Sequence, residues 1–224
     1  MAAVAIQTNP ALPAALAEKE PITISEEPLD LAQTLEAPNP SRYLITSPYP
    51  EPAHQLDLDS VNEENRLLAL ALVKMRSLRD DYATAPYLDT FNWEEIVETL
   101  RALARERGGH RWRETSFYIV AFRSQIPPTT VYSDLGVLDK AAHAEAVASG
   151  GFLKYWFGSP DAEGRNLATC VWRSREDAIK GGVGPAHRKA AGSARHLYSS
   201  WQIDRHRLVI RDEIESWDIV EWED

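Results

Sequence analysis

Apolar residues recur at every third or fourth position in two stretches near the middle of the chain. The first stretch begins at Ser60-Val61-Asn62-Glu63, which has the form of a helix capping box, and the second follows Asn92. Both patterns predict amphipathic helices that pack onto the rest of the fold rather than forming a groove for a partner. Their apolar positions are Leu67, Leu68, Leu70, Ala71, Val73, Met75 and Leu78 in the first, and Trp93, Ile96, Val97, Leu100 and Leu103 in the second.

After residue 115 the pattern changes to short apolar runs rich in β-branched and aromatic residues. Between them, helices are predicted to begin at Asp134, at Ser174 and, after a glycine break, at Pro185. The predicted strands cover residues 117–122, 152–157, 166–173, 202–211 and 217–222. The order predicts an α+β fold, a ferredoxin-like βαββαβ antiparallel sheet with both helices on one face, preceded by two helices.

Tryptophan is concentrated in this second part of the chain. Its indoles there are too many to leave in water, so the open face of the sheet needs a cover. We expect that cover to be the two N-terminal helices, the same face of a second copy, or both. The tryptophans concerned are Trp156, Trp172, Trp201, Trp217 and Trp222.

The first 59 residues have a different composition. They hold nine of the fourteen prolines and only two of the twenty aromatic residues, so they bury too little to offset the entropy of ordering. We therefore predict a disordered, acidic, Pro-rich tail over residues 1–59, with a partner-binding role for Tyr43-Leu44-Ile45 as the alternative. A helical extension over 60–109 and a sheet domain over 110–224 follow.

Charge and cysteine content narrow the function classes. Of 34 acidic and 24 basic residues, nine acidic and two basic ones lie in residues 1–60, so the remainder is nearly balanced and lacks the basic excess of a nucleic-acid binder. The single Cys170 cannot form an internal disulfide, which fits a reducing compartment. Without a leader, a membrane-length apolar run or metal-ligand spacing, we expect a cytoplasmic protein with no membrane, metal or cofactor.

A titratable ring is predicted to point inward near the end of the chain. The run Gly181-Gly182-Val183-Gly184-Pro185-Ala186-His187 places His187 in the first turn of a helix, on the face that carries its small and apolar residues. The positive end of the helix dipole disfavours an imidazolium there, so His187 would stay neutral and serve as a general base. A half-buried structural histidine is the alternative.

Other residues complete the predicted site. Tyr155, Trp156, Tyr198 and Trp201 would stack on or fix a ligand, and Arg173 would meet a carboxylate. Gly182 and Gly184, with Arg188 beside them, would present an anion-binding turn, although a glycine hinge explains the same residues. His143 is expected at the surface, and Cys170 is expected to be a small core residue.

The segment Trp172-Arg173-Ser174-Arg175-Glu176-Asp177, followed by Gly184-Pro185-Ala186-His187, resembles the dimeric α+β barrel superfamily. That superfamily includes stress-responsive barrel proteins, small monooxygenases and plant polyketide cyclases. The resemblance spans about residues 116–222 and implies a dimeric barrel, in whose cyclase branch the histidine matching His187 is the catalytic base. The branch's tyrosine and second histidine are replaced here by Gly181 and Gly184. The whole chain also resembles a family of uncharacterised fungal proteins.

Three hypotheses follow for the function. The first is a small-molecule-binding α+β barrel that works as a cofactor-free dehydratase, cyclase or monooxygenase, with His187 as acid or base on an aromatic or polyketide-like substrate. The second is a ligand-binding or dimeric scaffold protein without turnover. The third is a haem-binding barrel with His187 as the axial ligand.

Overall fold

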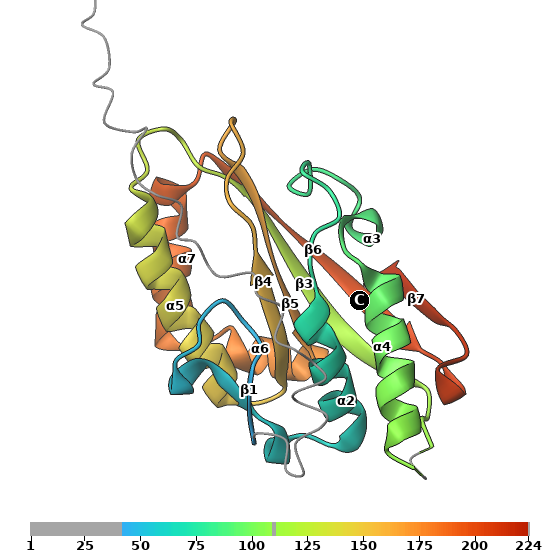
Figure 1. The fold of residues 1–224 in the computed structure, drawn as a ribbon. Helices are drawn as coiled ribbons and strands as arrows, with labels where there is room; N and C mark the ends of the chain where they lie inside the picture. Colours follow the sequence, from blue (N-terminus) through green and yellow to red (C-terminus); the bar gives the residue numbers. More distant parts are fainter. Residues whose placement is uncertain (1–41, 109–110, 224) are drawn as a thin grey trace, which may run out of the picture.

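The computed structural model describes residues 42–108 and 111–223, which form a five-stranded antiparallel sheet with helices on both of its faces and a separate two-stranded hairpin (Figure 1). Residues 1–41 of the segment predicted to be disordered therefore lie outside the described residues. Its predicted end at residue 59 is corrected by a hairpin of β1 (Tyr43–Ile45) and β2 (Gln55–Asp57), joined through a short 3-10 helix at Pro52–His54. Leu44 and Leu56 of this hairpin are buried against the rest of the fold. This burial orders a segment that contains few aromatic residues.

The two predicted helices are α2 (Glu63–Ala71) and α4 (Trp93–Glu106). Asn62 rather than Ser60 caps α2, because the Asn62 side chain accepts a hydrogen bond from the backbone N–H of Asn65. The helix also ends earlier than its apolar pattern suggests. Three short helical segments surround the pair, at Leu58–Ser60, Leu72–Lys74 and α3 (Tyr87–Thr90).

The sheet has the strand order β4-β5-β3-β6-β7, and all neighbours are antiparallel. Its first four members follow the ferredoxin-like arrangement, and β7 extends one edge. The strands are β3 (Thr115–Gln125), β4 (Phe152–Phe157), β5 (Arg165–Trp172), β6 (Ser200–Ile210) and β7 (Trp217–Glu221). The helices between them are α5 (Tyr132–Ser149), α6 (Arg175–Gly181) and α7 (Pro185–Leu197), and a short turn at Asp212–Ile214 precedes β7.

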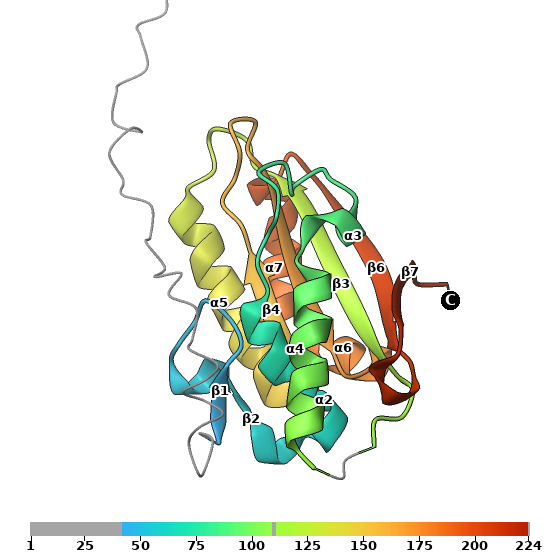
Figure 2. The same ribbon diagram turned by 45° about the vertical axis from the view of Figure 1, so that its right-hand side comes forward.

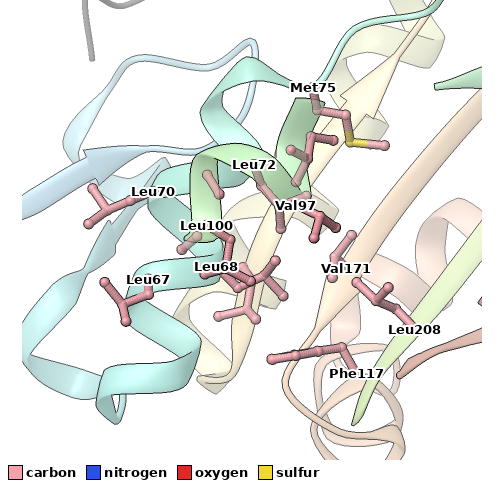
Figure 3. Packing of buried hydrophobic residues seen from close by; sticks show 14 of the residues in the cluster. Leu67, Leu68, Leu70, Leu72, Met75, Val97, Leu100, Phe117, Val171 and Leu208 are labelled. Atoms are coloured by element: carbon pink, nitrogen blue, oxygen red, sulfur yellow. The ribbon is translucent and has the colours of Figure 1, made fainter. Parts of the chain in front are cut away.

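The face of the sheet that a ferredoxin-like fold leaves open is covered by the chain itself. α2 and α4 lie on one side of the sheet, and α6 and α7 lie on the other (Figure 2). Phe117, Val171 and Leu208 from the sheet join Leu68 and other helix residues in one continuous buried cluster (Figure 3). The sequence predicts that the N-terminal helices, a second copy, or both cover this face. The structure shows the N-terminal helices there.

Candidate functional site

His187 is held at the start of α7 by a carboxylate from α5. Its Nδ1 lies 2.8 Å from Oε1 of Glu145. The same carboxylate accepts hydrogen bonds from the backbone N–H groups of Ala186, at 2.9 Å, and of His187, at 3.3 Å. Glu145 therefore caps the helix and orients the ring together.

The predicted anion-binding turn holds this internal carboxylate. A Cβ at Gly184 would overlap the carboxyl group of Glu145, so any other residue at this position would have to displace that side chain. Gly182 closes α6 by donating its N–H to Ala178, at 3.0 Å, and the Arg188 guanidinium contacts the Val183 carbonyl. The amides at the start of α7 are thus satisfied within the chain.

Replacing Gly184 by alanine is expected to lower the free energy of unfolding by about 1–2 kcal/mol, because the new methyl group displaces the Glu145 cap. Urea denaturation of the full chain measures this. The control is Gly192→Ala in the middle of α7, where a Cβ meets nothing within 4 Å and helix propensity predicts a gain of up to about 1 kcal/mol. Equal effects of the two substitutions would contradict the cap.

The hydrogen bond between Glu145 and His187 fixes which ring nitrogen carries a proton. Burial raises the pKa of Glu145, but the hydrogen bonds from the two backbone amides and the His187 ring outweigh it and hold that pKa below its ordinary value. An ionised carboxylate only accepts hydrogen bonds, so Nδ1 of His187 carries the proton. Nε2 is then the basic nitrogen, and it has no hydrogen-bond partner in the described part of the chain.

A second polar cluster lies between α5, β4 and the segment after β1. The hydroxyl groups of Tyr49 and Tyr155 each donate to one oxygen of Asp139, both at 2.5 Å. Burial raises the pKa of Asp139 and outweighs the hydrogen bonds from the two hydroxyl groups, which lower it.

Two buried histidines adjoin this cluster. Nδ1 of His54 lies 2.8 Å from Nδ1 of His143, and both side chains are buried. Burial lowers the pKa of His143 to about 3 and also lowers that of His54, so both rings are neutral in the folded protein. The expectation of a surface position for His143 is therefore wrong, because this face of α5 packs against Tyr155 and the N-terminal segment.

On the face of the sheet beneath α5 and α7, side chains from neighbouring strands form rows across the sheet, and these rows become less buried toward one end. The row Phe152, Trp172 and Tyr118 is buried, whereas the members of the next two rows are half-buried. Those two rows are Tyr155, Cys170 and Val120, then Phe157, Ala168 and Phe122. α7, which covers these two rows, has no fully buried residue.

The structure brings only some of the predicted ligand-binding residues to this layer. Tyr155 is part of it, and Tyr198 packs edge-on against Phe122 with ring centroids 5.4 Å apart. Trp156 lies on the other face of the sheet, because neighbouring residues of a strand point in opposite directions. Its ring centroid is 4.9 Å from that of Phe91.

Arg173 and Trp201 are placed away from the histidine. The Arg173 guanidinium makes two hydrogen bonds, of 2.7 and 2.9 Å, to Asp177 in the first turn of α6. Trp201 is largely exposed near the start of β6. Cys170 behaves as the expected small core residue: burial raises the pKa of its thiol to about 12, and its sulfur lies 2.9 Å from Nε1 of Trp172.

An open groove of about 440 Å³ runs along α5 and α7. Its lining combines apolar and polar side chains: Asp134, Val137, Leu138, Lys189, Gly192, Ser193, His196 and Leu197. His187 is not among them, so this groove gives no support to haem bound by His187.

Sequence reasoning missed Glu145, Asp139, Tyr49 and His54 as members of the site. One signal was available, since Asp139 and His143 are four residues apart and so share a face of α5. Tyr49 and His54 belong to the segment expected to be disordered. Glu145 could be found only once the packing of α5 against α7 was known.

Residues 45–221 match the sequence profile described as PB2B2.08-like, which covers most of the chain. The chain belongs to the PB2B2.08-like family. Among curated relatives, UPF0643 protein PB2B2.08 from Schizosaccharomyces pombe is 38% identical over 192 residues, which is 82% of this chain and 84% of the relative.

Solved structures share the sheet-and-helix arrangement at low identity. SnoaB, described as a cofactor-independent oxygenase from Streptomyces nogalater, is 12% identical with a TM-score of 0.33 and covers 40% of this chain and 90% of its own. Rv0793 from Mycobacterium tuberculosis is 15% identical with a TM-score of 0.35, and the match covers 49% of this chain and 97% of Rv0793. Within residues 42–108 and 111–223, the helices all fall short of the length and apolarity needed to cross a membrane.

Proposed function

We propose that this protein binds a small molecule between its sheet and α7, and that His187 acts on that molecule as an acid–base group. The hydrogen bond of 2.8 Å from Nδ1 of His187 to Glu145 carries the proposal, because it leaves Nε2 as the basic nitrogen. A base oriented by a carboxylate is the arrangement that proton-transfer catalysis uses.

The surroundings favour a planar, largely apolar ligand. Val120, Phe122 and Ala168 provide a half-buried apolar floor, and Tyr198 stands at its edge. An aromatic or polyketide-like substrate fits such a surface, and its phenol or enolisable carbon would exchange a proton with His187. Dehydration, cyclisation and oxygenation all begin with such a step, for which these side chains suffice without a cofactor.

The test is turnover of a panel of naphthols, anthrones and linear polyketide mimics by the full chain, followed by oxygen uptake and absorbance. For any compound that reacts, His187→Gln is expected to lower kcat by about 10²- to 10⁴-fold, the usual contribution of a general base. His196→Gln, on the same helix and in the groove lining, is the matched control and is expected to leave kcat unchanged. Unchanged turnover in His187→Gln would remove this mechanism.

One observation favours a second function, ligand binding without turnover. The groove along α5 and α7 has the volume of a small-molecule site, and Lys189 and Ser193 in its lining offer polar contacts. For this function, binding of the same panel should weaken in His196→Gln and be unaffected by His187→Gln. Isothermal titration of the two variants distinguishes the two functions.

A further inference from the structure

One edge of the sheet is covered along only half of its length. β6 pairs with β3 along all eleven of its residues, but β7 pairs only with the part of β6 from His206 to Ile210. The last hydrogen bond on that side runs from the Trp222 N–H to the Arg205 carbonyl, at 2.9 Å. On the side away from β3, residues 200–204 therefore have no strand beside them among the described residues (Figure 1).

This stretch lacks the usual protection of a strand edge. Natural edges are blunted by lysine, proline, bulges or a covering segment, because an open edge pairs readily with another strand. The opposite edge of the sheet has such a cover, since the N–H of Tyr155 in β4 donates to the Thr46 carbonyl at 2.9 Å. Residues 200–204 read Ser-Trp-Gln-Ile-Asp, and their register with β3 contains no bulge.

The same stretch exposes two large apolar side chains on one face of the sheet. Trp201 is 46% exposed and Ile203 is 43% exposed. They are two residues apart on one strand, so they point in the same direction. An exposed aromatic residue and an exposed β-branched residue beside an open edge are typical of a surface that pairs with another strand.

We propose that residues 200–204 pair antiparallel with the same residues of a second copy of this chain. Centred on Gln202, this pairing sets Trp201 opposite Ile203 of the second copy and Ile203 opposite its Trp201. Such aromatic and β-branched cross-strand pairs are stabilising. Ser200 lies opposite Asp204 of the second copy, so a hydroxyl group faces a carboxylate and no like charges meet.

Two features make the second copy the partner that this edge fits. The sequence of the stretch is complementary to itself across a two-fold axis, as a symmetric dimer interface requires. Its one acidic residue is already neutralised, because Asp204 forms an ion pair of 2.9 Å with Arg123, so the chain's net charge of −10 is not concentrated there. α2 and α4 cover one face of the sheet, so a second copy cannot pack on that face. The edge at residues 200–204 remains accessible to it.

Sedimentation velocity of the full chain at about 5–500 µM tests the association. We expect a monomer–dimer equilibrium whose dissociation constant rises at least tenfold in Ile203→Lys, since lysine on an edge opposes pairing. The matched control is Val220→Lys on β7, where the side chain is 48% exposed and lies outside the stretch; it is expected to leave the equilibrium unchanged. A monomer throughout this range, or a dimer unaffected by Ile203→Lys, overturns the proposal.

Cysteine cross-linking tests the register. Gln202→Cys would place two thiols on the two-fold axis, where the Cα atoms of facing residues are about 4.5–5.5 Å apart and a disulfide can form. Ser200→Cys is the control, because four residues of register separate its two copies by about 13 Å. We expect an interchain disulfide in Gln202→Cys and none in Ser200→Cys or in the wild-type chain with its Cys170. Equal cross-linking of the two variants, or none in Gln202→Cys, overturns the register.

Discussion

Replacement of Leu68 by aspartate is expected to unfold the protein at room temperature. Leu68 is completely buried in α2, within the cluster that α2 and α4 form with the sheet. An unpaired carboxylate there and the loss of the leucine contacts together cost more than about 4–5 kcal/mol, which is most of the stability of an ordinary domain. Circular dichroism and one-dimensional NMR of the full chain measure the outcome.

The matched control for this substitution is Leu78→Asp, at a leucine whose side chain is mostly exposed. Its free energy of unfolding is expected to change by no more than about 0.5 kcal/mol. If Leu68→Asp kept the sheet folded and only α2 and α4 melted, the N-terminal helices would be an appendage. The single cluster in Figure 3 predicts instead that helices and sheet unfold together.

Acidification from pH 7 to pH 5 is expected to destabilise the protein by about 2 kcal/mol through His143 alone. Its pKa is about 3 in the folded protein, below the ordinary value of 6.5 that the unfolded chain regains. Below pH 6.5 the unfolded state therefore binds more protons than the folded state, and stability falls as the pH is lowered toward 3. The stability is fully present above pH 6.5. Urea denaturation across this range measures the slope.

His143→Phe removes the titrating ring and keeps an aromatic side chain against Phe152 and Tyr155. Its stability should be lower at pH 7, because His54 loses a partner, but should vary less between pH 7 and pH 5. His196→Phe, at an exposed position on α7, should keep the wild-type slope. An unchanged slope in His143→Phe would show that the buried pair does not remain neutral.

Most of the fold could be predicted from the pattern of the chain, since period two and period three-to-four patterns record which face of each element is buried. β4 (Phe152–Phe157) and the start of α7 at Pro185 lie where the pattern puts them, and the antiparallel sheet has the ferredoxin-like order. The β1–β2 hairpin could not be predicted. Its few leucines become buried only against distant parts of the chain, and nothing local distinguishes it from a loose tail.

The site was predictable only in part, for a similar reason. The helix start and its apolar face locate His187, but the groups that define its chemistry come from α5, more than forty residues away. Neighbouring residues of a strand point to opposite faces of the sheet, and Tyr155 and Trp156 do so. The prediction that both belong to one site was therefore inconsistent with the strand that the sequence itself predicted. The four-residue spacing of Asp139 and His143 was a weak local signal, but the partner of Asp139, Tyr49, lies ninety residues earlier.

The measurement that tests the proposed site most directly is a long-range ¹H–¹⁵N spectrum of the histidine rings at about pH 8. The hydrogen bond to Glu145 predicts that His187 is the Nδ1–H tautomer, with an unprotonated Nε2, and that Glu145→Gln shifts the ring toward a mixture of tautomers. A ring of His187 with Nε2–H, or a spectrum that Glu145→Gln leaves unchanged, would contradict the oriented base on which the proposed function depends.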